Sequence, residues 1–505
     1  MPGPRIFCAI ALASVCFAQR PPIHRPRHTL ADPVVLTSAD VSAVVQAAAA
    51  SVNSDAMVVA VTDRQGDILA IYRKPAAPAT SSANFGIQAP TDEVAVALAR
   101  TTSFFSNSQA PLSSRTVRFI SGIHFPPGIA YTSNAPLYGI ENTNRGCPFN
   151  ADYIDGQDFP PARSIDGLQP GLGILTGKAD LNDGDPNAVN PGGVPLFKQG
   201  VLVGGVGVAG VPPNVAEYAA VVGAIGANLF VPLPLPPPGE VLIGGIALPF
   251  VNQTTMPAGY GAGSADGVFT LGPLSSPKPA PEGDLVAPRA GPLGGLTAAE
   301  VQGIVNAAVA EANLTRAVIR LPLGSRARMV IAVADLDGTL LALHRMPDAT
   351  VFSIDVAVAK SRNVIFFSGP NRTPADLPGV PMGTAVTNRT ISFGAQPIYP
   401  PGVPSSPGPF FSLYQFDTLH PCSQGSQAPN PNQNGIVFFP GSLPLYKNGV
   451  LVGGLGVSGD GVDQDDFVTA AGAASFEAPA NIHADQIIDQ GVRLPYIKFP
   501  QNPTF

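Results

Sequence analysis

The chain has 505 residues, more than one hydrophobic core of ordinary size accommodates, and this length predicts two domains. It is 45% hydrophobic and 12% charged, with 56 prolines and 54 glycines, a composition typical of compact cores joined by long ordered loops and not of a disordered chain. The net charge of −7 leaves no basic surface to neutralise a phosphate backbone, so we expect no nucleic-acid partner.

The N-terminus is typical of a cleaved signal peptide at residues 1–18. A single arginine precedes an apolar run at 6–17, which is too short to span a bilayer. Lipidation of Cys16 is the alternative, and the bulky valine before it disfavours that reading. We therefore expect an exported protein, periplasmic or extracellular, without membrane contact after cleavage and with an extended proline-rich leader at 19–33.

Two segments repeat the same landmarks in the same order, and we call residues 34–230 copy one and residues 296–480 copy two. Each opens with a helix that a threonine, Thr37 or Thr297, can cap together with an acid three residues later. A β-hairpin follows, then an alanine-rich helix ending in Phe-Phe-Ser, a proline- and glycine-rich excursion, a second hairpin and a final helix. The strands are expected at 57–63, 67–73, 194–197 and 201–208 in copy one and at 329–335, 339–345, 443–446 and 450–457 in copy two, with final helices at 214–227 and 464–473.

This element order predicts an α+β fold, because paired hairpins form a mainly antiparallel sheet that needs helices to cover it. Residues 231–295 are expected to form a proline- and glycine-rich, semi-rigid linker with a short strand pair near 241–250. Residues 481–505 are expected to form a C-terminal tail that wraps the other copy or a neighbouring molecule.

Cys147 and Cys422 occupy corresponding places in the two excursions, after an Arg-Thr pair and a Pro-Pro-Gly turn. If the copies pack about a pseudo-twofold axis, equivalent residues near that axis meet, and an exported protein can oxidise two such cysteines. We therefore hypothesise a disulfide between Cys147 and Cys422. Two unrelated free thiols are the alternative.

Residues 333–346, 357–362 and 453–466, together with the opening Leu-Thr helix, resemble the GlcG/HbpS family of haem-binding, proposed haem-degrading domains. The resemblance covers nearly all of copy two outside its excursion. It implies a three-layer, profilin-like domain with an antiparallel sheet between helices, and haem or a related tetrapyrrole as the bound cofactor. It also implies oligomerisation, so the two copies would form a linked pseudo-dimer that can assemble into homo-oligomers.

Copy one departs from the family pattern where a function would be expected. Leu98 stands in the place of Lys360, Ala209 in the place of Ser458, and a turn with one acid in the place of the acidic cluster at 460–466. Copy two is therefore the better candidate for the ligand, and copy one is expected to be partly structural.

The candidate ligand contacts all lie in the family-like stretches of copy two. His344 is the candidate metal ligand, since haem iron takes His, Met, Cys or Tyr, with an ordinary strand histidine as the alternative. Arg345, Lys360 and Arg362 are candidate partners of the haem propionates, although Arg362 could instead pair with Asp355 in its own helix.

Ser458 and Gly459 complete this set of candidates. They end a glycine-rich turn that lacks the lysine of a nucleotide-binding loop. Its glycines permit close approach of the backbone, either to a packed helix or to a flat ligand.

No residue is assigned a catalytic role. The chain holds no Ser/His/Asp arrangement, zinc-protease motif or Cys-x-x-Cys, and residues 180–185 are like a calcium loop but have a misplaced glycine and no closing glutamate. An ordinary acidic turn is favoured there. We predict a protein that binds haem or a related tetrapyrrole; the alternatives are a ligand-free interaction scaffold and an enzyme that acts on a small metabolite through Lys360 or the acidic cluster.

Overall fold

The computed structural model describes residues 33–149, 162–176, 190–231, 242–243, 245–400 and 406–504. The predicted signal peptide, nearly all of the leader and the acidic turn at 180–185 lie outside these residues. Within the described ranges, none of the helices has the length and apolar character needed to cross a membrane.

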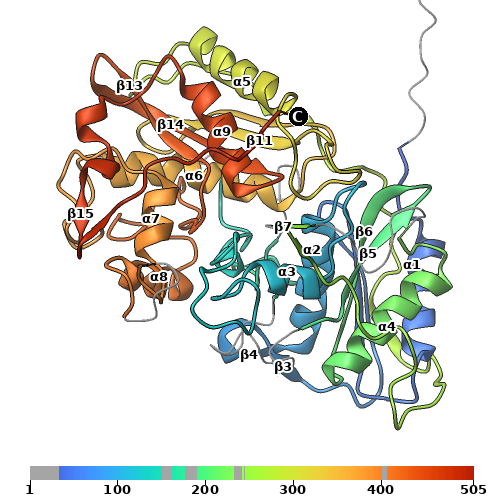
Figure 1. The fold of residues 1–505 in the computed structure, drawn as a ribbon. Coiled ribbons are helices and arrows are strands. Elements are labelled where there is room, and N and C mark those ends of the chain that lie inside the picture. Colours follow the sequence, from blue (N-terminus) through green and yellow to red (C-terminus); the bar gives the residue numbers. More distant parts are fainter. Residues whose placement is uncertain are drawn as a thin grey trace, which may run out of the picture. The chain divides into compact units, whose positions relative to one another are not determined.

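Copy one folds in the predicted order (Figure 1). Its helices are α1 (Ser38–Ala50), α2 (Thr91–Phe105), α3 (Ser114–Ile120) and α4 (Pro213–Gly226). Its strands are β1 (Val58–Asp63), β2 (Ile68–Arg73), β3 (Thr80–Ser82), β4 (Gln88–Pro90), β5 (Gly193–Lys198) and β6 (Val201–Ala209). The sequence pattern did not indicate the short β3–β4 hairpin, inserted between β2 and α2, or the helix α3 in the excursion.

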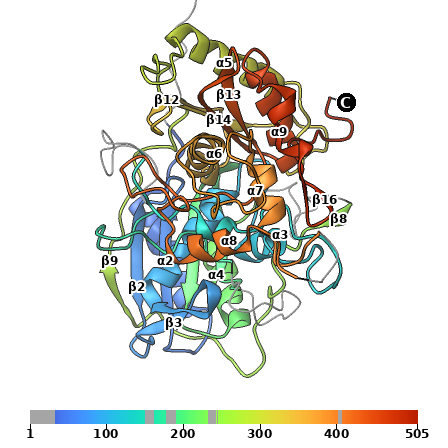
Figure 2. The same ribbon diagram turned by 90° about the vertical axis from the view of Figure 1, so that its left-hand side faces the viewer.

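Copy two has the same order without that insertion. Its helices are α5 (Ala298–Ala312), α6 (Phe352–Ser368), α7 (Asn388–Gly394), α8 (Phe411–Leu419) and α9 (Val462–Ala473). Its strands are β11 (Met329–Ala334), β12 (Leu340–Arg345), β13 (Ser442–Lys447) and β14 (Val450–Gly459). The excursion forms α7 and α8, and α7 packs against α6 (Figure 2).

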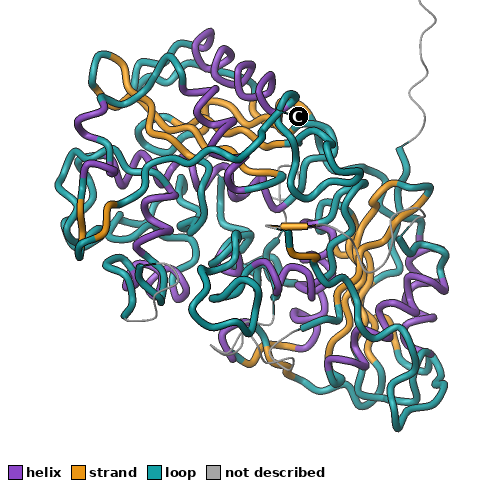
Figure 3. The backbone as a smooth tube through the Cα atoms, viewed as in Figure 1, coloured by secondary structure: helices purple, strands orange, loops and turns teal. Residues whose placement is uncertain are grey.

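Each copy builds an antiparallel sheet, in the order β5-β6-β1-β2-β9 and, in the same sense, β13-β14-β11-β12-β10. Side chains alternate between the faces of a strand. In β1, Val59 and Val61 join the core under α1 and α4, whereas Val58 and Ala60 join the core under α2. The sheet therefore lies between two helical layers, and the α+β prediction is confirmed (Figure 3).

The segment expected to be a linker supplies the fifth strand of both sheets. Strand β9 (Val268–Leu271) pairs with β2, and β10 (Gly283–Val286) pairs with β12. A two-stranded hairpin, β7 (Leu242–Ile243) with β8 (Ile246–Ala247), lies where the short strand pair was expected. A matching hairpin in the C-terminal tail pairs β15 (Ile488–Asp489) with β16 (Val492–Arg493). Both hairpins lead into a Leu-Pro-aromatic segment.

Both predicted capping boxes are present. In copy one, Thr37 Oγ1 accepts a hydrogen bond from the Asp40 amide at 3.2 Å. The Asp40 carboxylate in turn accepts a hydrogen bond from the Thr37 amide at 2.8 Å. Asp40 also accepts from Lys198 Nζ at 2.6 Å, at the tip of the β5–β6 hairpin. In copy two Glu300 caps α5 in the same way and lies 2.9 Å from Lys447 Nζ. The capping acid thus fastens each first helix to the last hairpin of its sheet.

The predicted disulfide joins the two excursions. Cys147 and Cys422 are bonded, with their Cα atoms 5.6 Å apart. Nearby, the rings of Tyr138 and Tyr414 stack with centroids 5.0 Å apart. Further along, Phe105 at the end of α2 stacks on Phe352 at the start of α6, with centroids 4.1 Å apart.

Candidate functional site

The six candidate ligand contacts do not form one cluster. His344 and Arg345 are neighbours on β12, so their side chains point to opposite faces of the sheet. Arg345 is on the α6 face, because it pairs through Val330 with Ser458, whose hydroxyl donates to Ser353 of α6 at 3.0 Å. His344 is on the face that α5 and α9 cover.

His344 lies near the sheet edge and is held by an acid from the linker segment. Its Nδ1 is 2.7 Å from Asp284 Oδ1 on β10, and the two side chains are 22% and 44% exposed. A carboxylate on one ring nitrogen is the usual setting of a metal-binding histidine, because it fixes the ring and leaves the other nitrogen for the metal. The same contact also serves simply to join β10 to β12.

Arg345 binds backbone carbonyls. Its guanidinium donates to the carbonyl of Ala349 and, at 2.8 Å, to that of Pro281. Burial lowers the pKa of Arg345 to about 10, because the interior disfavours the charged form. These contacts tie the end of β12 to the chain entering α6 and to the segment before β10.

Lys360 is buried in the layer between α6 and the sheet. Its ammonium donates to Asp465 Oδ2 at 2.9 Å and to the carbonyl of Val457 at 2.8 Å, and it lies 4.9 Å from the centre of the Phe439 ring. Burial lowers the pKa of Lys360, and burial raises the pKa of Asp465 to about 7. The sequence comparison named Lys360 and the acidic cluster as two separate features that copy one lacks, and the structure brings them into contact.

The other acids of this cluster are also paired. Asp466 and Asp463 of α9 both bind Arg389 of α7, at 2.5 and 2.6 Å. Copy one keeps this link, since Arg115 Nε lies 2.8 Å from Glu217 Oε1. A pair present in both copies serves the packing of the short helix on the final helix.

A third pair extends the network to the other copy. Asp460, at the end of β14, binds Arg320, which donates to Asp348 at 2.8 Å. Asp348 in turn accepts from the amide and hydroxyl of Ser108 in copy one, each at 3.1 Å. Among the described residues no group of acids, histidines and cysteines has the arrangement of a metal site.

Arg362 holds the β11–β12 turn. It donates to the carbonyl of Gly338 at 2.9 Å and to Asn434 Oδ1 at 2.9 Å, while the amide of Asn434 donates to Asp355 at 3.2 Å. Asn434 therefore stands between the two residues of the suggested intrahelical pair. Arg100 in copy one makes the same bond to the carbonyl of Gly66, at 2.9 Å, so this arginine has a structural role in both copies.

The glycines of β14 allow α6 to pack closely on the sheet. A Cβ atom at Gly456 would lie 2.1 Å from the carbonyl oxygen of Ala357, and one at Gly454 would lie 2.1 Å from that of Ser361. Copy one repeats this, with Gly207 against Ala95. Of the two explanations for the glycine-rich turn, the packed helix accounts for these positions.

A cavity of about 760 Å³ lies at the junction of the two copies, and we call it the junction pocket. Phenylalanine side chains from both copies and the tail line it, as do charged residues and the end of β14. These include Phe105, Phe125, Phe352, Phe393, Phe499, Arg389, Asp463, Lys498 and Gly459. Gly459 is the one residue of the six candidates that reaches this pocket. Two further lining residues carried a sequence signal: Asp463 belongs to the acidic cluster, and Arg389 stands in a repeated Arg-Thr landmark. Sequence reasoning missed the aromatic lining.

Comparisons with known proteins find similarity to one family in copy two. Residues 296–474 match the family model "Haem degrading protein HbpS-like". Corrinoid adenosyltransferase PduO from Salmonella typhimurium is 27% identical over 163 residues, which are 32% of this chain and 36% of that protein. The PduO of Citrobacter freundii is 28% identical over 163 residues, which are again 32% of this chain and 36% of that protein. The chain thus spans about a third of the length of these curated relatives.

Three solved structures match about a third of this chain at low similarity. The crystal structure of a PduOC–haem complex is 22% identical, with a TM-score of 0.24, and the match covers 37% of this chain and 96% of that one. Klebsiella pneumoniae ORFY is 19% identical with a TM-score of 0.24, covering 35% and 86%. A double mutant of Streptomyces reticuli HbpS is 20% identical with a TM-score of 0.20, covering 34% and 84%.

Proposed function

We propose that this chain binds haem or a related tetrapyrrole in the junction pocket. The observation that carries the proposal is the lining of that pocket, in which aromatic rings from both copies meet Arg389 and Lys498. A tetrapyrrole is a flat apolar ring with carboxylate side chains, so aromatic walls can bury its faces and cations can meet its carboxylates. The volume of about 760 Å³ is in the range of small-molecule sites. The HbpS-like match over residues 296–474 supports the same ligand class.

The lining also defines how the ring would be held. Lys498 is 65% exposed and pairs with Asp463 at 2.9 Å, so it can exchange that partner for a ligand carboxylate at little cost. The described residues of the pocket wall include no His, Met, Cys or Tyr, the side chains that bind haem iron. We therefore propose recognition through the ring and its carboxylates. His344, which lies outside this pocket, remains the alternative iron ligand. Arg345, Lys360, Arg362 and Ser458 lie on the α6 side of the sheet, away from His344, and do not join it in one site.

We also propose that copies one and two are a tandem repeat packed as a pseudo-dimer. Two pairs of corresponding residues support this: Cys147 is bonded to Cys422, and Tyr138 stacks on Tyr414. Each tyrosine follows a leucine shortly before its cysteine. Corresponding residues meet in this way only near a twofold axis.

Export is the remaining part of the proposal. A disulfide persists in oxidising compartments, and the Cys147–Cys422 bond supports such a location. Sequencing the N-terminus of the mature protein from its natural host tests this directly. A first residue near Gln19 is the expected result, and a mature chain that still begins at Met1 would contradict export by a cleaved signal.

The ligand proposal is tested by titrating the purified full-length protein with hemin and, separately, with metal-free protoporphyrin. We expect both to bind, with a shifted Soret band and quenched porphyrin fluorescence. Lys498→Ala and Phe499→Ala change exposed residues of the pocket wall. Each should weaken the binding of both ligands by about three- to tenfold. Lys278→Ala removes an exposed lysine outside the pocket and is the matched control.

The outcomes are distinct. Loss of hemin binding in His344→Ala, without an effect of Lys498→Ala or Phe499→Ala, would move the site from the junction pocket to His344. Absence of any change with either ligand would overturn tetrapyrrole binding itself.

A further inference from the structure

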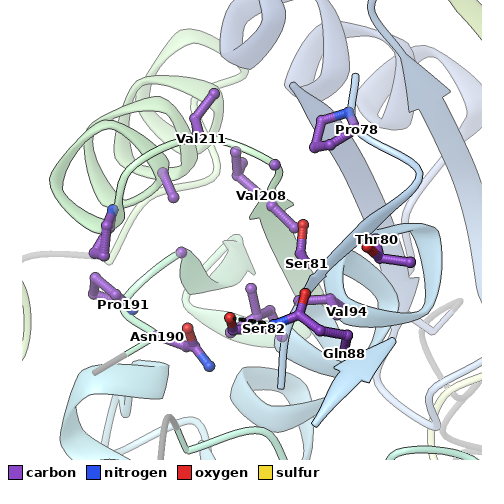
Figure 4. Close-up of a pocket in the computed structure, with 16 residues that line it drawn as sticks. Pro78, Thr80, Ser81, Ser82, Gln88, Val94, Asn190, Pro191, Val208 and Val211 are labelled. Atoms are coloured by element: carbon purple, nitrogen blue, oxygen red, sulfur yellow. Dashed lines mark hydrogen bonds between the residues drawn. The ribbon is translucent and has the colours of Figure 1, made fainter. Parts of the chain in front are cut away.

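Copy one has an open pocket of about 430 Å³ between α2, α4, the end of β6 and the β3–β4 hairpin, and we call it the hairpin pocket (Figure 4). It lies where copy two holds the buried Lys360–Asp465 pair. Leu98 of α2 lines it at the place of Lys360, and Ala216 of α4 lines it at the place of Asp465. The replacement of a long cation and its acid by shorter apolar side chains accounts for the free volume.

A second departure from copy two shapes the same pocket. The chain between β2 and α2 runs from 74 to 90 in copy one but only from 346 to 351 in copy two. The extra residues form the β3–β4 hairpin, whose Thr80, Ser81, Ser82 and Gln88 line the pocket. Two independent differences between the copies therefore form this pocket. The shorter side chains of Leu98 and Ala216 leave free volume, and the inserted hairpin adds polar side chains to the lining.

The lining of the hairpin pocket combines polar and apolar side chains. On the hairpin, Gln88 Nε2 donates to Ser82 Oγ at 2.9 Å, which sets a hydroxyl and an amide carbonyl side by side as donor and acceptor (Figure 4). Asn190 adds another amide. Val94, Val208, Leu98 and Ala216 add apolar side chains to the lining. The lining residues that the structure describes include no charged side chain, in contrast to the charged cluster at the same place in copy two.

We propose that the hairpin pocket binds a small uncharged molecule with hydroxyl groups along one edge and a hydrocarbon face, the chemistry of a neutral monosaccharide. Hydroxyl groups satisfy the serine and amide groups of the hairpin, and the C–H face packs on the valine and leucine wall. A charged ligand would lose its hydration without gaining a partner of opposite charge. This site is separate from the junction pocket and does not depend on tetrapyrrole binding.

The test compares glucose with two charged analogues: glucuronate, in which a carboxylate replaces the hydroxymethyl group, and glucosamine, in which an ammonium replaces the 2-hydroxyl. Galactose and ribose are further neutral probes. Binding to the full-length protein is followed by saturation-transfer NMR and by titration. We expect at least one neutral sugar to bind at millimolar concentration and the charged analogues to bind at least tenfold more weakly. Absence of binding by all three neutral sugars, or equal binding of glucose, glucuronate and glucosamine, would overturn the proposal.

Two variants locate the site. Leu98→Lys/Ala216→Asp restores the residues of copy two and should reduce binding at least tenfold by filling the pocket. Ser82→Ala/Gln88→Ala changes exposed residues that leave the core intact, and it should weaken binding at least threefold even if the first variant fails to fold. Its matched control is Ser42→Ala/Gln46→Ala, which removes a serine–glutamine hydrogen bond of 3.2 Å elsewhere in copy one. Equal binding by the Ser82→Ala/Gln88→Ala variant and its control would place any sugar outside this pocket.

Discussion

The ammonium of Lys360 and the carboxylate of Asp465 form a fully buried ion pair, with Nζ and Oδ2 2.9 Å apart. Burial lowers the pKa of Lys360 and raises the pKa of Asp465 to about 7, because a low-dielectric interior disfavours both charges. Copy one has Leu98 and Ala216 in these places and forms the same layers. The fold therefore does not require this ion pair. Where the pair is present, each buried charge requires the other to neutralise it.

Removal of one partner should be far more harmful than removal of both. Lys360→Met leaves Asp465 buried without a cation and should lower the free energy of unfolding by about 3–5 kcal/mol. Lys360→Leu/Asp465→Ala reproduces copy one and should cost less than Lys360→Met, because no buried charge is left unpaired. Urea unfolding of Lys360→Leu, of Asp465→Ala and of the double variant measures the coupling. If the stability losses of the two single variants add up to the loss of the double variant, the two side chains do not stabilise each other.

Asp355 makes the stability of the protein depend on pH. Burial raises its pKa to about 6 from an ordinary value of 3.8, although the amide of Asn144 donates to it at 2.8 Å and opposes the shift. Between those two pH values the folded chain keeps a proton that the unfolded chain releases. This contribution to stability is fully present below pH 3.8 and is lost as pH rises through 6, a change of roughly 3 kcal/mol.

Asp355→Asn removes this titration. The free energy of unfolding of the variant, measured from pH 4 to pH 7, should fall less steeply with rising pH than that of the parent protein. The comparison uses the slope, so it holds even if the variant is less stable at every pH. Identical slopes would show that Asp355 titrates alike in the folded and unfolded chain.

The disulfide links positions 275 residues apart. A cross-link that closes a long loop restricts the unfolded chain, so Cys147→Ser/Cys422→Ser should lower the free energy of unfolding by roughly 4 kcal/mol. Reductant should shift the unfolding midpoint of the parent protein and leave that of the double variant unchanged. A parent protein that unfolds alike with and without reductant would contradict the contribution that we assign to this bond.

The fold was largely predictable because its signals are local. Capping threonines, Gly-containing turns and apolar alternation lie in neighbouring residues and recur in both copies, so each copy supports the reading of the other. The edge strands β9 and β10 were missed, because an edge strand pairs on one side alone and carries a weaker apolar pattern. The tail hairpin was missed for a similar reason, although Leu248-Pro249-Phe250 and Leu494-Pro495-Tyr496 were a readable repeat.

The candidate site was harder to predict because it depends on distant contacts. His344 and Arg345 adjoin in sequence, yet the alternation of the strand sends them to different faces. Lys360 and Asp465 are far apart in sequence and meet only because α6 and α9 lie near the same strand. The junction and hairpin pockets are formed by residues from several elements, and no single stretch of sequence indicates either of them.

The glycines of β14 give the sharpest test of the close packing of α6 on its sheet. Gly456→Ala would place a Cβ atom 2.1 Å from the carbonyl oxygen of Ala357 and 3.0 Å from Lys360 Cβ, so helix and sheet would have to separate. We expect a loss of about 3 kcal/mol or more in the free energy of unfolding. Gly303→Ala on α5 is the matched control, because a Cβ atom at this position meets no other atom within 4 Å. This substitution should stabilise the helix by about 0.5–1 kcal/mol. Thermal or urea unfolding should therefore give opposite signs for the same chemical change. Equal effects of the two substitutions would mean that the α6 layer is looser than these contacts require.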